Sequence, residues 1–141
     1  MNRGVIVDLG HGRSSFSFRV CEQALAQGMP IDTISSDLHR GNVDRYAVSL
    51  ARTMTKLRSL GLELEDVVRR VTINPARAIG IHERGFGRLE DRLTSTLTIF
   101  READGEFVLE DAEGACRTVE RFVEPVGVVV DGVFHAAVEA I

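Results

Sequence analysis

The stretch Gly4-Val5-Ile6-Val7-Asp8-Leu9-Gly10-His11-Gly12 decides the fold class of this chain. Its apolar residues up to Val7 are continuous rather than alternating, and most are β-branched. This pattern is typical of a short strand that is covered on both faces in a parallel sheet. We therefore expect a buried strand over residues 4–8, followed by a polar turn that contains His11 between two glycines.

A helix and a second strand follow this first strand. Apolar residues recur at helical spacing, up to a glycine placed to end the helix: Phe18, Cys21, Leu25 and Gly28. A second short apolar run, Ile31-Asp32-Thr33-Ile34-Ser35-Ser36, ends at Asp37-Leu38-His39. Strand, helix and strand within about 35 residues make one βαβ unit, so the beginning of the chain is predicted to be α/β.

Three more helices are expected after this unit. Apolar spacing and terminating glycines place them from Tyr46 to Leu60, from Leu64 to Val71, and from Asn74 to Gly80, with Asn74 as the N-cap of the third. In the first of these helices the basic residues are expected off the buried face: Arg45, Arg52, Lys56 and Arg58.

From Gly85 onward the sequence has the pattern of short antiparallel strands. Four β-type runs, at 97–100, 106–109, 122–124 and 126–130, alternate with turn signals at 103–105, 111–114 and 131–132. The pair Asp131-Gly132 is typical of a two-residue hairpin turn. We therefore divide the chain into an α/β part, 1–84, and an antiparallel β part, 85–141.

Composition excludes several classes of function. The chain has 141 residues, the length of one ordinary domain, and its 17 basic and 21 acidic residues give a net charge of −4. That balance argues against nucleic acid or an anionic membrane as partner. No apolar run approaches the ~18 residues of a membrane span, and the start does not resemble a signal peptide, so a cytoplasmic protein is expected. Cys21 and Cys116 are expected to be buried thiols.

The residues with chemical potential stand where the two predicted strands end. His11 follows the first strand, and Asp37 and His39 follow the second. Because loops at the carboxyl ends of parallel strands converge on one pocket, these three side chains are expected to share a site. Gly10 and Gly12 let the backbone approach a ligand closely. The alternative is that Asp37 caps a helix and His11 lies in an ordinary turn; a phosphate or sugar pocket is disfavoured because the P-loop Lys-Ser/Thr is missing.

Three motifs in order carry a family resemblance. They are Asp8-Leu9-Gly10-His11-Gly12 with Ser15-Phe16-Ser17-Phe18, then Pro30-Ile31-Asp32-Thr33-Ile34-Ser35-Ser36-Asp37-Leu38-His39, then Thr72-Ile73-Asn74-Pro75-Ala76. Together they resemble the carboxyl-terminal part of an amidohydrolase-superfamily enzyme, of the dihydroorotase-like amidohydrolase/deacetylase branch. The resemblance implies the last βα units of a (β/α)8 TIM barrel over 1–84, followed by strands of a small β-sandwich over 85–141.

The same resemblance implies a metal-dependent hydrolase that acts on a C–N amide or cyclic amide bond of a small molecule. In such enzymes divalent ions, usually zinc, lower the pKa of a bound water and polarise the carbonyl group. Asp37 matches the family's catalytic aspartate, which binds the metal and moves a proton. His11 matches the family histidine near the substrate, and Gly12 belongs to the same substrate-binding loop.

The family's other metal ligands are missing from this sequence. It contains no His-x-His, and its single lysine, Lys56, falls where the family's metal-bridging lysine is not found. A barrel alone takes ~250 residues. We therefore expect a truncated gene product, a mis-called start or one piece of a larger enzyme, inactive alone. The alternative is a non-catalytic binding module that forms homo-oligomers, because a two-stranded parallel unit has two unpaired edges. The motifs do not specify the substrate.

Overall fold

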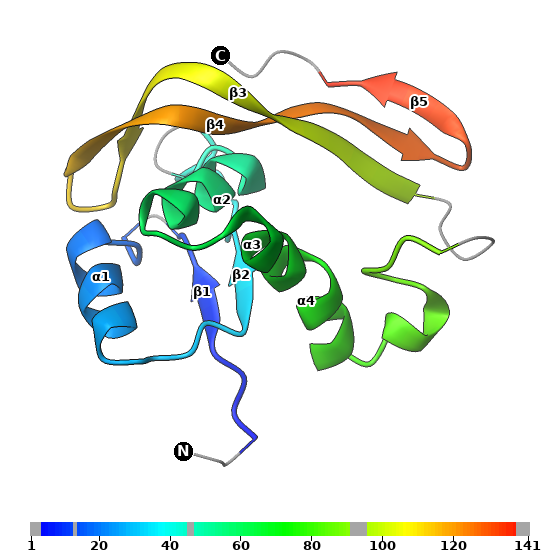
Figure 1. Ribbon diagram of the computed structural model, residues 1–141, viewed down its shortest axis with the longest axis horizontal. Helices are drawn as coiled ribbons and strands as arrows, with labels where there is room; N and C mark the ends of the chain where they lie inside the picture. Colours follow the sequence, from blue (N-terminus) through cyan, green and yellow to red (C-terminus); the bar gives the residue numbers. More distant parts are fainter. Residues whose placement is uncertain (1–3, 13, 45–46, 91–95, 138–141) are drawn as a thin grey trace.

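The fold is organised around one central helix, α2, which has a small sheet on either side (Figure 1). The computed structural model describes residues 4–12, 14–44, 47–90 and 96–137. The strands, in chain order, are β1 (Asp8–Gly10), β2 (Thr33–Ser35), β3 (Thr96–Glu110), β4 (Cys116–Val130) and β5 (Val133–Ala136). β1 and β2 pair in parallel, and β3, β4 and β5 form an antiparallel sheet in that order.

The predicted βαβ unit is present. Helix α1 (Phe18–Ala26) connects β1 to β2, as a parallel pair requires a crossover. Ser17 caps this helix, since its hydroxyl accepts from the Val20 N–H. The first strand is displaced from its expected place: β1 begins at Asp8, and Val5 and Ile6 are 72% and 52% exposed. The expectation of a run buried on both faces is therefore wrong, because in the described residues β1 pairs with β2 alone.

The other predicted helices are α2 (Leu50–Ser59), α3 (Leu64–Val71) and α4 (Ile73–Ala78), followed by the 3-10 turn η1 (His82–Arg84). α2 begins later than expected because the Ser49 hydroxyl caps it by accepting from Arg52 N–H; Arg45 and Tyr46 lie outside the described residues. Asn74 is not the N-cap of α4. It lies inside the helix and donates from Nδ2 to the Asp32 carbonyl oxygen at 2.8 Å.

The antiparallel sheet is simpler than the sequence predicted. The four expected runs merge into two 15-residue strands, β3 and β4. The expected turn at 103–105 is wrong, because these residues stay in β3 and are accommodated by a shift of register between Asp104 and Phe107. The hairpin at Asp131-Gly132 is confirmed: both residues have positive φ, 49° and 81°, and Val130 pairs with Val133 across the turn.

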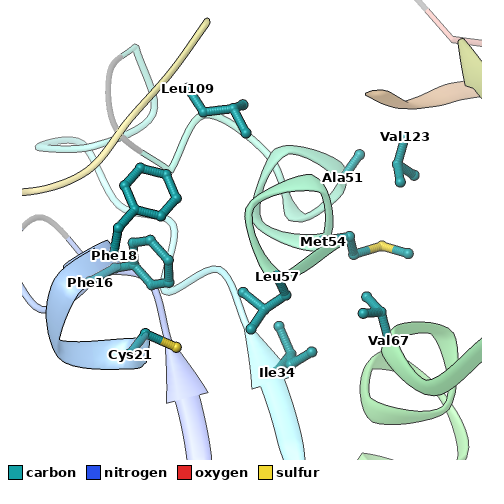
Figure 2. Packing of buried hydrophobic residues seen from close by; sticks show 10 residues of the cluster. All are labelled: Phe16, Phe18, Cys21, Ile34, Ala51, Met54, Leu57, Val67, Leu109 and Val123. Atoms are coloured by element: carbon teal, nitrogen blue, oxygen red, sulfur yellow. The ribbon is translucent and has the colours of Figure 1, made fainter. Parts of the chain in front are cut away.

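One apolar core joins both sheets through α2 (Figure 2). Leu57 points from α2 toward Ile34 of β2, while Ala51 points toward Val123 of β4 (Figure 2). Because α2 is covered on two sides, six of its residues are buried, among them Lys56, which is fully buried. The expectation that Lys56 lies off the buried face is therefore wrong.

The two cysteines differ in their environments. Cys21 is buried in the core as expected, whereas Cys116, at the start of β4, is exposed, and both are free thiols. Cys116 lies outside the core because it stands at the end of the β3–β4 hairpin. The expectation of burial is therefore confirmed for Cys21 and wrong for Cys116. No helix among the described residues has the length and apolarity needed to span a membrane.

Candidate functional site

One face of the β1–β2 pair is polar. The register places Asp8 opposite Thr33 and Gly10 opposite Ser35, so these side chains share a face. The Asp8 carboxylate accepts hydrogen bonds of 2.6 Å from both the Thr33 and the Ser35 hydroxyl groups. Gly10 has no side chain to cover this network. The polar face is open to solvent at Asp8, which makes it a candidate site at the carboxyl ends of two parallel strands.

Asp37 stands just beyond the end of β2. Its carboxylate is exposed, and Oδ2 lies 3.1 Å from the position that a Cβ on Gly12 would occupy. The structure therefore brings Asp37 and Gly12 together, and the carboxylate rests where a larger residue in place of Gly12 would crowd it. Gly12 itself has a φ of +48°, a conformation that favours glycine.

The loop that carries Asp37 is held in an unusual conformation. Asp37 has a φ of +46°, which few residues other than glycine, asparagine and aspartate adopt. Asn42, only 1% exposed, secures the loop: its Nδ2 donates to the Asp37 carbonyl oxygen, and its Oδ1 accepts from His39 N–H, both at 2.8 Å. A backbone held in this way is typical of a residue positioned for function.

The structure does not place His39 beside Asp37 as a second functional group. His39 is exposed, and its Nδ1 accepts from the Gly41 N–H at 3.0 Å. One ring nitrogen is thus used to stabilise the loop itself. His39 therefore acts in this structure as part of the turn that follows Asp37.

His11 lies in the core, unlike the exposed Asp37 carboxylate. It is fully buried, and its ring stacks on Phe16 with centroids 5.0 Å apart. Its Nδ1 is 2.9 Å from the Gly12 carbonyl oxygen, and its Nε2 is 2.5 Å from Lys56 Nζ. The structure therefore places the His11 ring in the core, with both ring nitrogens close to protein groups, and the Asp37 carboxylate at the surface.

Burial controls the charge of this histidine and lysine. Burial, reinforced by the positive charge of Lys56, lowers the pKa of His11 to about 4, against opposing effects of the Gly12 carbonyl and Asp111. Burial and then Arg52 lower the pKa of Lys56 to about 8, while Asp111 and Glu110 raise it. At pH 7 His11 is neutral, and Lys56 is mostly charged. Because a carbonyl cannot donate, Nδ1 carries the proton of His11 and Nε2 accepts from Lys56.

We expect acid to destabilise this fold through His11. Its pKa is about 4 in the folded chain against 6.5 ordinarily, so the unfolded chain binds more protons between those values, and stability falls as the pH drops from 6.5 to 4. The loss is about 3 kcal/mol from this group. Urea unfolding over this pH range measures it, with His11→Phe as the non-titrating control. Equal slopes for the two proteins would contradict the expectation.

Sequence reasoning missed two members of this region. Asp8 belongs to the first motif of the family resemblance, and its alternation with Leu9 is the signal that places it on the polar face. For Lys56 no comparable signal exists. The burial of Lys56 depends on a sheet that begins forty residues later in the chain, at Thr96. The helical spacing of apolar residues in α2 does not predict this burial.

A complete metal centre does not fit the described residues. Within residues 4–12, 14–44, 47–90 and 96–137, no group of three or more His, Cys, Asp or Glu side chains is arranged to hold a metal ion. Asp37 offers one exposed carboxylate, whereas the oxygens of Asp8 already accept two hydroxyl groups. A catalytic zinc usually takes three protein ligands.

The sequence is similar to those of known proteins. The chain is 36% identical over 132 residues to a deacetylase from Enterococcus faecalis, covering 93% of this chain and 35% of that protein. It is 37% identical over 122 residues to a deacetylase from Agrobacterium fabrum, covering 86% and 30%. The chain thus spans about a third of the length of these curated relatives. No family model matches it.

Solved structures give the same result. An adenine deaminase superposes with a TM-score of 0.86 at 34% identity, and a dihydroorotase with 0.82 at 35%. Each superposition covers 96% of this chain, but 37% and 35% of the respective structure. The chain therefore has an amidohydrolase-like fold, a mixed α/β arrangement with a three-stranded antiparallel sheet.

Proposed function

We propose that this chain supplies part of a hydrolase of the amidohydrolase type, which cleaves a C–N amide or cyclic amide bond in a small molecule. The observation that carries this proposal is Asp37, an exposed carboxylate in a left-handed loop at the carboxyl end of a parallel strand. In barrel folds active sites are built at that end of the strands. Relatives named deacetylase, adenine deaminase and dihydroorotase support the same reaction class.

In this proposal Asp37 is the catalytic carboxylate. Amide hydrolysis needs a group that takes a proton from the attacking water and returns it to the leaving nitrogen. The Asp37 carboxylate is open to solvent and so can meet both water and substrate. Gly12 leaves room beside it, and we assign the backbone at Gly12 to the substrate-binding loop. His11 supports this loop from its buried side, because the ring lies in the core.

We further propose that these residues alone are not a complete active site. Asp37 supplies one metal-binding carboxylate at most, so the zinc implied by the family resemblance would need ligands from outside this sequence. The resemblance likewise implies that β1, α1 and β2 belong to the end of a (β/α)8 barrel and that β3, β4 and β5 belong to a β-sandwich. The third of each relative that this chain matches is consistent with such a division.

A graft tests the proposed function. The matching third of the Enterococcus faecalis deacetylase is replaced by this chain, and release of acetate from N-acetyl amides is measured beside the opening of cyclic amides. We expect the graft to hydrolyse at least one of these amides. A graft that folds and binds metal like its parent, but cleaves none of them, would contradict the proposal.

We expect the 141-residue chain to bind less than one zinc ion per chain. A single carboxylate is a weak ligand set, and the described residues contain no cluster to complete it. Elemental analysis of the chain after size-exclusion chromatography measures the zinc content. Stoichiometric zinc that disappears in Asp37→Ala would show that the chain builds a metal site by itself or between copies, and would overturn the incomplete-site proposal.

A second candidate function is a non-catalytic module that self-associates. Two features favour it: the exposed apolar side chains of Val5 and Ile6 just before β1, and an edge of β1 that pairs with no strand among the described residues. In this case a second copy of the chain covers that edge. Sedimentation velocity at rising protein concentration distinguishes the two, because a chain that stays monomeric and folded would exclude the self-associating module.

A further inference from the structure

The Lys56 side chain is a cationic group inside the core. It is the one lysine in the sequence, and it is fully buried. Its ammonium group contacts His11 Nε2 at 2.5 Å, donates to the Glu110 carbonyl oxygen at 2.6 Å, and lies 5.6 Å from the centroid of the Phe16 ring. Burying an ammonium group is unfavourable unless it is well paired. These contacts join α2 to the end of β3 and to the turn after β1.

His11 links the Lys56 side chain to the backbone of the turn at Gly12. With Nε2 accepting from Lys56, the proton of the neutral ring is on Nδ1, which donates to the Gly12 carbonyl oxygen at 2.9 Å. The stacking of the ring on Phe16 fixes its plane. The Ser15 hydroxyl also donates to the His11 carbonyl oxygen, at 3.0 Å. The turn at Gly12 is therefore held from its buried side.

Asp37 lies beside the same turn. The carboxylate oxygen of Asp37 stands 3.1 Å from the Cβ position of Gly12, so a displacement of Gly12 changes the space beside that carboxylate. Contacts thus run from Lys56 through His11 to the Gly12 carbonyl oxygen, and the Asp37 carboxylate lies beside Gly12.

We propose that Lys56 is a positioning residue for Asp37: by holding His11 with its proton on Nδ1, it fixes the turn at Gly12, beside which the Asp37 carboxylate lies. The inference rests on the proposed function for the role of Asp37 in catalysis. Because Lys56 also binds the Glu110 carbonyl oxygen, the antiparallel sheet takes part in placing the candidate catalytic group.

Nitrogen-15 NMR of the 141-residue chain tests the arrangement without any assay of activity. In the wild-type chain at pH 7 we expect His11 to be neutral and protonated on Nδ1, with its signals assigned by their absence in His11→Phe. In Lys56→Met, which keeps the length of the side chain but removes the donor, we expect both tautomers to be present. The pKa of His11 then rises from about 4, and stays below 6.5 because the ring is still buried.

Thr55→Val is the matched control. Thr55 is the neighbouring buried residue of α2 and also reaches the antiparallel sheet, since its Oγ1 accepts from Val123 N–H at 3.0 Å. Both variants lose one contact between α2 and that sheet. We expect the signals of His11, the Gly12 amide and the Asp37 carboxyl carbon to change in Lys56→Met and to stay as in the wild type in Thr55→Val.

Three results would overturn the proposal. They are a wild-type His11 ring protonated on Nε2, wild-type signals in a folded Lys56→Met chain, and the same changes in Thr55→Val as in Lys56→Met. The first is decided on the wild-type chain, even where a variant fails to fold. In the graft, Lys56→Met is expected to lower kcat about 100-fold. A graft with no turnover at all contradicts the proposed function, whereas the NMR result judges the role of Lys56 separately.

Discussion

Asp37→Asn is expected to lower kcat of the graft by about 10²–10⁴-fold, the contribution of a general acid–base group. The asparagine amide cannot take a proton from water, so the reaction loses the group that moves the proton. The fold should persist, because the side chain is exposed and asparagine also tolerates the left-handed backbone found at this position. Initial rates measured at saturating substrate give the result.

Asp104→Asn is the control for this experiment. Asp104 lies in β3, its side chain is 88% exposed, and its ion pair with Arg121 spans 3.6 Å. The same change of one carboxylate to an amide there is expected to leave turnover unchanged. Normal turnover in Asp37→Asn, or an equal loss in Asp104→Asn, would remove Asp37 from the proposed catalytic role.

The second large effect concerns stability. Asp111→Ala is expected to destabilise the chain by about 3–5 kcal/mol, because a buried carboxylate that accepts three backbone hydrogen bonds is removed. Asp111 is fully buried. Its Oδ2 accepts from Phe18 N–H, the first residue of α1, and its Oδ1 accepts from the N–H groups of Glu113 and Ala115, all at 2.9 Å. Urea unfolding at pH 7 measures the loss.

Two further variants make this measurement specific. Asp111→Asn keeps one oxygen acceptor but turns an NH2 group toward backbone N–H groups, so it is expected to fall between wild type and Asp111→Ala. Asp104→Ala removes an exposed carboxylate from the same hairpin and is expected to change stability little. If Asp111→Ala unfolded at the same urea concentration as Asp104→Ala, the hydrogen bonds of Asp111 would not support the fold as argued.

The parts of the fold that follow from neighbouring residues were predictable from the sequence. Ser17 and Gly28 bracket α1, and Asp131-Gly132 makes a hairpin, because caps and tight turns depend on the conformations allowed to a few adjacent residues. The exposure of Val5 and Ile6 was not predictable in this way. A continuous apolar run shows that a strand can be covered, but whether it is covered depends on what packs against it.

The candidate site could likewise be predicted only in part from the sequence. Asp37 is predicted by its place after a strand, whereas the burial of His11 is not, because the turn between two glycines gives no sign of what packs against it. Lys56 and Asp111 belong to contacts between residues far apart in the sequence, 45 positions for Lys56 with His11 and 93 for Asp111 with Phe18. Local periodicity contains no information about such pairs.

The bond between Phe18 and Asp111 also sets an order of events as the chain is made. A ribosome that adds about 5–20 residues per second needs roughly 5–20 s to cross the 93 positions between them. During that time the first turn of α1 is without the carboxylate that binds its N–H group. α1 has nine residues, too few for a stable isolated helix. The α1 helix therefore gains this capping bond only after Asp111 has left the ribosome.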